Sequence, residues 1–187
     1  MKDKKNSKII IGIIVLACVL VVAVSYAVSE LTLTGDENVI MSVGDIDVTL
    51  ADNSTDVISI SNGLPVQDSV GKASAPYKFT IHNNGTRSVK VDIYLADDAE
   101  QLASCNQTNG SCGLINASMI KYELITPDAT TSSLLPTNRL IGTVTIAPSG
   151  SKTNELRIWL DWDASDSTAK GKYFFGKISL DVTELSE

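Results

Sequence analysis

After residue 44 the chain consists of short segments in which apolar and polar residues alternate, separated by Gly, Pro, Asn and Ser. A period of two puts the apolar side chains of an extended strand on one face, and two such faces pack against each other. The segments with this pattern are 46–50, 57–60, 77–81, 89–95, 120–125, 140–146, 156–160 and 173–182. They predict an all-β fold, an antiparallel jelly-roll-like β-sandwich.

Helical patterns are short in this part of the sequence. Residues 97–103 predict one or two helical turns, and nothing after residue 28 shows sustained helical periodicity. The run Asn83-Asn84-Gly85-Thr86 lies between two predicted strands. Because Asn-Gly between alternating runs is typical of a tight turn, we expect a hairpin there. The run at 130–133, Thr-Thr-Ser-Ser, predicts a solvated loop.

The N-terminus carries an export signal. Residues 1–8 hold four Lys and one Asp, residues 9–24 are apolar, and Ser25-Tyr26-Ala27 has the small-x-small pattern of a cleavage site. We therefore expect signal peptidase to cut between Ala27 and Val28, giving a leader at 1–27, an extended segment at 28–43 and a sandwich domain at 44–187. The alternative is an uncleaved anchor helix, since 9–28 approaches the length that spans a bilayer. In the cleaved case, we expect contact with the membrane only through this N-terminal segment and only before cleavage.

Charge and composition exclude several classes of function. The chain has 15 Lys plus Arg and 22 Asp plus Glu, a net charge of −7, which becomes −10 if residues 1–27 are removed. Nucleic acid is excluded as a partner because no basic face is available to neutralise phosphates. The chain holds one His, His82, which we expect in the hairpin facing water. A hydrolytic zinc site needs a cluster such as His-Glu-x-x-His, and one histidine cannot supply it. We expect no cofactor and no enzyme activity.

The best metal candidate is the acidic loop around residue 163. Asp161, Asp163 and Asp166 offer carboxylate oxygens at spacings that Ca²⁺ could use, and a solvated turn is the alternative. The two tryptophans flank this loop. We expect Trp159 in the core and Trp162 at the rim, with carbohydrate binding as a further alternative for the pair.

Two cysteines follow the predicted leader, which itself contains Cys18. In an exported protein, Cys105 and Cys112 predict a disulfide that closes a small polar loop, against free thiols or a metal ligand pair. Five N-x-S/T sequons are also present, and they carry glycans if the host has the transferase. They begin at Asn53, Asn84, Asn106, Asn109 and Asn116.

Residues 28–43 precede the first predicted strand, 46–50. Leu31 and Leu33 alternate with Thr32 and Thr34, so the segment is expected to be extended. It is either an edge strand of its own sandwich or a strand donated to a neighbouring subunit, where it would satisfy the unpaired N–H and C=O groups of a sheet edge.

The order of several motifs resembles a known family. The leader ends in Ser-Tyr-Ala at 25–27, and a first strand follows at 44–50, Gly-Asp-Ile-Asp-Val-Thr-Leu. A loop at 60–68 reads Ile-Ser-Asn-Gly-Leu-Pro-Val-Gln-Asp, Asn-Asn-Gly follows the strand that begins at Tyr77, and Gly-Lys-Tyr-Phe-Phe-Gly-Lys-Ile-Ser-Leu-Asp-Val stands at 171–182. Together these resemble the TasA/camelysin family of exported biofilm-matrix proteins. Camelysin-like members have been described as metalloproteases, a role that the single His argues against here.

The resemblance implies a secreted jelly-roll subunit that polymerises with itself into extracellular or cell-surface fibres. Each subunit's N-terminal segment would complete the sheet of the next, once the signal peptide is removed. In this chain the donor would be 28–43, with Leu31, Leu33, Val39 and Ile40 filling the groove. The alternative, from a different class, is a monomeric surface adhesin or binding module held by an uncleaved N-terminal helix.

Overall fold

The computed structural model describes residues 31–34, 39–43, 46–52, 57–61, 63–164 and 169–185, with backbone alone for the first two ranges. The predicted leader and the cleavage site between Ala27 and Val28 lie outside the described residues. Within those ranges, no helix combines the length and apolar character needed to cross a membrane.

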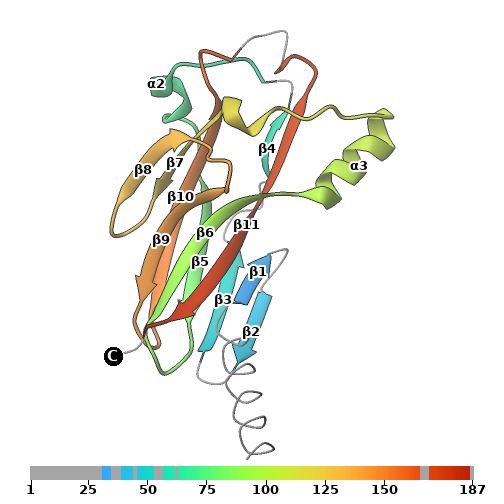
Figure 1. Ribbon diagram of the computed structural model, residues 1–187. Helices are drawn as coiled ribbons and strands as arrows, with labels where there is room; N and C mark the ends of the chain where they lie inside the picture. The colour runs from blue at the N-terminus through green and yellow to red at the C-terminus, as the bar shows by residue number, and fades with distance from the viewer. Residues whose placement is uncertain are drawn as a thin grey trace, which may run out of the picture.

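Two antiparallel sheets make up the fold (Figure 1). Sheet A has the order β1 (Leu31–Thr34), β11 (Tyr173–Glu184), β6 (Val89–Asp97) and β9 (Leu140–Ile146), and β4 (Ile58–Ser61) also pairs with β11. Sheet B has the order β2 (Val39–Val43), β3 (Ile46–Asp52), β5 (Tyr77–Asn83), β10 (Ser151–Leu160), β7 (Ile120–Ile125) and β8 (Thr130–Leu134). The predicted antiparallel sandwich is confirmed.

Most connections cross from one sheet to the other. Among the described strands, the links from β2 to β3 and from β7 to β8 stay within one sheet, and every other link changes sheet. This repeated crossing is the jelly-roll-like feature of the fold. It also brings strands that are distant in sequence side by side, as with β5 and β10.

The hairpin predicted at 83–86 is wrong. The turn joins β5 of sheet B to β6 of sheet A, so the two strands that it connects do not pair with each other. The side chain of Asn83 holds this crossing. Its Nδ2 donates to the carbonyl oxygens of Arg87 (2.8 Å), Ala147 (3.1 Å) and Ile146 (3.2 Å), and its Oδ1 accepts from the backbone N–H of Gly85 (3.0 Å). An Asn-Gly turn fixes a local reversal, but the partners of the strands decide whether it closes a hairpin.

The core lies between the sheets and follows the predicted alternation. Its largest fully buried side chains come from β5, β6, β7, β9, β10 and β11, two from each strand. They are Phe79, Ile81, Ile93, Leu95, Ile120, Leu124, Ile141, Ile146, Leu156, Leu160, Ile178 and Leu180. At Gly142 the sheets approach so closely that a Cβ would lie 2.4 Å from Leu124 Cδ2. Burial also raises the pKa of the Tyr122 phenol, because the charged form loses hydration.

Trp159 is buried as predicted. It lies on the outer face of sheet B beneath a short helix, and not in the core between the sheets. The short α2 (Asp68–Gly71) covers its ring so tightly that a Cβ on Gly71 would lie 2.3 Å from Trp159 Cδ2. Trp162 is 60% exposed, as a residue at the rim should be.

Two elements differ from their predicted extent. The helix predicted at 97–103 is α3 (Ala99–Asn109), and the carboxylate of Asp98 caps it by accepting from the N–H groups of Glu100 and Gln101, both at 3.0 Å. The predicted loop at 130–133 is the edge strand β8, exposed along its whole length. A single 3₁₀ turn, η1 (Ala117–Met119), leads into β7.

Candidate functional site

The N-terminal strand β1 lies on the edge of sheet A. It runs antiparallel to β11, with Leu31 opposite Val182 and Leu33 opposite Leu180. The first four residues of the same β11 edge, 173–176, are occupied by β4. The two short strands therefore lie end to end along one edge of β11, whose other edge is paired with β6.

The second N-terminal strand, β2, lies on the edge of sheet B. It runs antiparallel to β3, with Val39 opposite Leu50 and Val43 opposite Ile46. Figure 1 shows β1 and β2 next to each other on the same side of the sandwich. Segment 28–43 thus contributes one strand to each sheet of its own chain.

The edges beneath these strands carry core residues. Leu180 and Val182 on β11, and Ile46, Val48 and Leu50 on β3, are all buried. We call the line between these two edges the seam. Displacement of β1 and β2 would expose backbone hydrogen-bonding groups along the seam, next to the core, and these are the two features that an added β-strand uses.

Three of the four predicted donor residues lie opposite core positions. Leu31, Leu33 and Val39 face Val182, Leu180 and Leu50 in the register. Ile40 lies opposite Thr49, a half-buried residue, while Met41 lies opposite the core residue Val48. The sequence could not reveal this because the register of an edge strand depends on its partner. For the same reason, the sequence does not show that Leu180 and Val182 pair with β1. Their alternation predicts only that they are core residues.

The acidic loop is engaged by a lysine. Lys121 Nζ lies 3.0 Å from Asp161 Oδ1 and 3.0 Å from Asp68 Oδ1, joining the loop after β10 to α2. The interactions of the Lys121 ammonium with the carboxylates of Asp161 and then Asp68 raise the pKa of Lys121, and the hydrogen bond that Lys121 donates lowers the pKa of Asp68. Asp163 lies in the turn after Asp161, and Asp166 is outside the described residues. An ammonium group is therefore already paired with one of the three carboxylates named in the calcium hypothesis.

Cys105 and Cys112 form a disulfide. Cys105 lies on α3, and Cys112 lies in the segment that leads back to the sheets, so the bond ties the end of the helix to that segment. The predicted polar loop between the cysteines is therefore mostly helix, with Gly110 as its C-cap at φ 80°.

The remaining candidates are scattered over the surface. His82 lies on β5, half-buried, between Thr49 and Ser151 of the neighbouring strands. Four of the five sequon asparagines are exposed, and Asn53 lies outside the described residues. The exposed ones are Asn84, Asn106, Asn109 and Asn116. Within the described part of the chain, no group of three or more His, Cys, Asp or Glu side chains is placed to hold a metal ion.

No family model and no curated protein matches this sequence. Weak structural likenesses extend over most of the chain. A putative secreted protein from Eubacterium rectale is 15% identical with a TM-score of 0.30, over 83% of this chain and 40% of that one. The secreted serine protease VesC from Vibrio cholerae is 10% identical with a TM-score of 0.23, over 78% and 22%. A GH31 α-xylosidase from Xanthomonas citri is 7% identical with a TM-score of 0.22, over 84% and 23%.

The chain therefore spans well under half the length of each of these proteins. Likenesses of this strength say nothing about the activity of this chain.

Proposed function

We propose that the protein is a secreted structural subunit that polymerises into extracellular or cell-surface fibres by exchange of its N-terminal strands. The observation that carries the proposal is the placement of segment 28–43. Its strands β1 and β2 occupy one edge of each sheet on the same side of the sandwich, and both lie at the N-terminal end of the described chain. The proposal assigns the protein no catalytic role.

Exchange would keep the same contacts between different copies. If β1 of one subunit paired with β11 of the next, the register from Leu31–Val182 to Thr34–Ser179 would be satisfied as it is within one chain. In such swapping, each hydrogen bond between β1 and β11 within one chain is replaced by the same bond between two subunits. The subunits are then linked head to tail. Because the interface is heterologous, the chain of subunits continues as a filament unless its rotation closes a ring.

A covalent lock on β1 tests this proposal. In the double variant Leu31→Cys, Val182→Cys, oxidation of the monomer would bond two register partners and hold β1 on its own β11. We expect the oxidised variant to remain monomeric in electron micrographs and sedimentation. Reduction should restore filaments, and wild-type protein under the same reductant controls for the Cys105–Cys112 bond. An oxidised variant that forms filaments at the wild-type rate would contradict strand exchange.

A mixing experiment identifies the acceptor strand. Filaments grown from equal amounts of the single variants Leu31→Cys and Val182→Cys should give the disulfide-linked heterodimer on oxidation. Lys177→Cys in place of Val182→Cys is the matched control, because Lys177 is on the same strand but beyond the residues that pair with β1. Deletion of 28–43 should abolish filaments, and filaments that persist in the deletion would exclude this segment as the donor.

The second candidate function is a membrane-anchored monomeric adhesin or binding module. One observation favours it: β1 and β2 complete the sheets of their own chain, so a single copy already has paired edges at the seam. N-terminal sequencing of the exported protein separates the candidates. A start at Val28 supports the fibre, whereas retained Met1 supports the anchor.

A further inference from the structure

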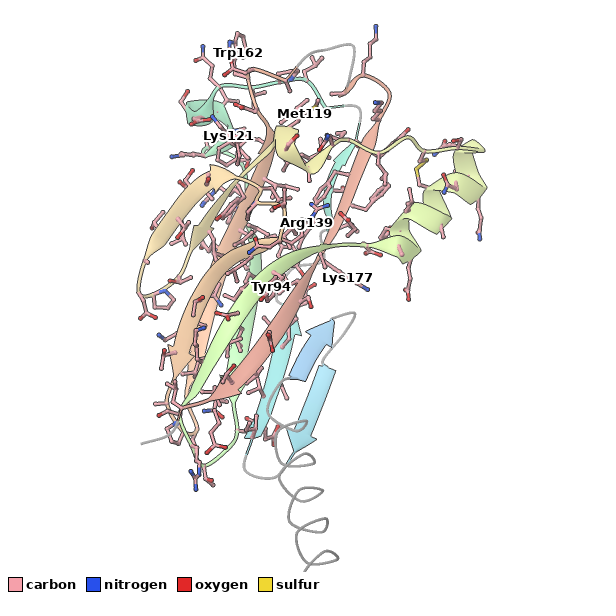
Figure 2. The ribbon with its side chains drawn as sticks, viewed as in Figure 1. Tyr94, Met119, Lys121, Arg139, Trp162 and Lys177 are labelled. Carbon is pink, nitrogen blue, oxygen red and sulfur yellow. A yellow bond between two sulfur atoms is a disulfide. The ribbon has the colours of Figure 1, made fainter. Side chains whose placement is uncertain are left out.

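The edge of sheet B that lies opposite β2 is an uncovered strand. β8 is the last strand in the order of that sheet, and among the described strands it pairs with β7 alone. All of its residues are exposed, including the apolar Leu134 at 44%. Leu134 lies opposite Lys121 in the register, and Figure 2 labels that lysine close to the end of β8. This edge is therefore separate from the seam, which lies along β3 and β11.

Alternate residues of β8 direct their backbone groups away from β7. In an antiparallel pair, successive residues of a strand face the partner and the open side in turn. The N–H group of Leu135 donates to the carbonyl oxygen of Ile120 at 2.7 Å, so Leu135 faces β7. The carbonyl oxygen of Ala129 accepts from the N–H group of Thr126 at 2.8 Å, so Ala129 faces the same way. The residues whose N–H and C=O groups face outward, with no bond to a described residue, are Thr130, Ser132 and Leu134.

β8 also lacks the features by which proteins commonly protect a sheet edge. Those features are charged side chains, proline, bulges and a covering segment. The sequence of β8, Thr-Thr-Ser-Ser-Leu, contains no charge, proline or glycine, and its pairing with β7 keeps one register throughout. In contrast, β9, the edge of sheet A on this side of the sandwich, pairs with β6 through a register shift between Ile93 and Tyr94. β8 is thus the regular and uncharged edge on this side.

We propose that β8 pairs with β8 of a second copy of this chain, antiparallel and across a two-fold axis at Ser132. In that register Ser132 lies opposite its own equivalent, and Thr130 lies opposite Leu134 of the second copy. Each outward-facing residue of one copy then meets an outward-facing residue of the other, and every such pair exchanges two backbone hydrogen bonds. The open edge is self-complementary, as an interface with two-fold symmetry must be. The two six-stranded sheets join into one continuous sheet.

The side chains and charges around β8 fit this pairing. Leu134 packs against Thr130 of the second copy, which removes exposed apolar surface from water. Asp128, in the turn before β8, is already paired with Lys152. In the proposed register the two copies of Asp128 lie at opposite ends of the paired strands, about 27 Å apart, whereas the Debye length is about 8 Å. Like charges therefore do not face each other at this edge, although the chain as a whole is acidic.

The pairing does not depend on the exchange of N-terminal strands, because β2 and β8 are opposite edges of sheet B. A single short strand gives a small interface, so we expect a Kd of about 0.1–1 mM and a monomer at micromolar concentrations. A filament would present β8 on every subunit, so that many weak pairs act together and hold filaments side by side. That consequence, unlike the pairing itself, rests on the proposed function.

Single-cysteine variants of the exported protein test the register. Ser132→Cys should give a disulfide-linked dimer on oxidation, because its two copies lie directly opposite, with Cα atoms about 5.5 Å apart. Thr130→Cys is the matched control on the same strand, since its two copies lie about 14 Å apart. A mixture of Thr130→Cys and Leu134→Cys should give the linked heterodimer. Non-reducing denaturing gels separate these dimers from strand-exchanged subunits, which share no covalent bond.

Small-angle X-ray scattering over a concentration series measures the strength of the pairing. The background is the oxidised variant Leu31→Cys, Val182→Cys, which holds β1 on its own chain. Ser132→Pro removes the outward N–H group at the two-fold axis and leaves the bonds to β7 in place, so it should raise the Kd at least about tenfold. Ser132→Ala keeps that N–H group and should stay within about twofold of its parent.

Three results would overturn the proposal, with circular dichroism confirming that each variant is folded. The first is that Thr130→Cys cross-links with itself as fast as Ser132→Cys, as random collision or parallel pairing requires. The second is that the locked protein remains monomeric at about 2 mM. The third is that Ser132→Pro and Ser132→Ala dimerise with the same Kd.

Discussion

Asn83 connects two turns at one end of the sandwich, and it shows how a single polar side chain can fix the path between the sheets. It is 1% exposed, and its amide contacts the carbonyl groups of three residues from two separate segments. A turn signal in the sequence marks Asn83 and its neighbours. The Asn83 side chain joins the turn at 83–87 to residues 146–147, which are more than sixty residues away in the sequence. A local sequence pattern cannot predict such a contact.

We predict that Asn83→Ala lowers the free energy of unfolding by about 2–3 kcal/mol, because it leaves buried carbonyl groups without a donor. Urea unfolding followed by tryptophan fluorescence measures the change. The adjacent Asn84→Ala is the matched control, since Asn84 is exposed and makes two long hydrogen bonds of 3.4 and 3.5 Å. Its effect should stay within about 0.5 kcal/mol. Equal effects of the two substitutions would contradict the bridging role.

At the scale of elements, alternation predicts which residues face the core but not which sheet a strand joins. Val89, Val91, Ile93 and Leu95 are all fully buried, as their spacing requires. The partners of their strand, β11 and β9, are set by tertiary pairing and could not be read locally. The edge strand β8 was missed because its Ser/Thr-rich sequence has no apolar face, and its strand form comes from hydrogen bonding to β7.

The helix α3 is an appendage that the disulfide holds in place. None of its residues is buried, so the core does not depend on it. We predict that Cys105→Ser, Cys112→Ser lowers the free energy of unfolding by at most about 2.5 kcal/mol, the value expected for closing so short a loop.

Hydrogen exchange followed by mass spectrometry locates the effect of that double variant. Amide exchange should rise within 99–115 and remain unchanged in β6 and β11, while the far-UV circular dichroism keeps its β-sheet form. Loss of the cooperative unfolding transition in the variant would show instead that the bond supports the whole fold.

At the scale of the molecule, ion pairs tie the surface of sheet B together and make its stability depend on pH. The hydrogen bond from Lys78 lowers the pKa of Glu155, as that from Lys121 lowers the pKa of Asp68. A carboxyl group whose pKa is lowered in the folded state stabilises the fold above its unfolded pKa. This contribution is lost as the pH falls through the lowered folded value.

We therefore predict that the free energy of unfolding decreases as the pH falls from about 5 to about 2. Asp68→Asn together with Glu155→Gln should make that decrease smaller. Lys121 has a raised pKa, so its contribution is complete below its unfolded pKa and is lost as the pH rises through the folded value. Urea unfolding at a series of pH values measures the free energy of unfolding in both the acidic and the basic range. An equally steep decrease at acidic pH in the double variant would contradict the roles of Asp68 and Glu155.

The position of β11 also governs when the protein can fold. It is the central strand of sheet A, bonded to β6 along one edge and to β4 and β1 along the other, yet it begins at residue 173. Until residues 173–184 have been synthesised, sheet A lacks the strand that joins β1 and β4 to β6. The crossings between the sheets also give the chain a high contact order, which slows folding. We therefore expect sheet A to remain incomplete through most of the synthesis of the chain. If the chain is exported as we propose, that delay would let its sheets assemble after it has crossed the membrane.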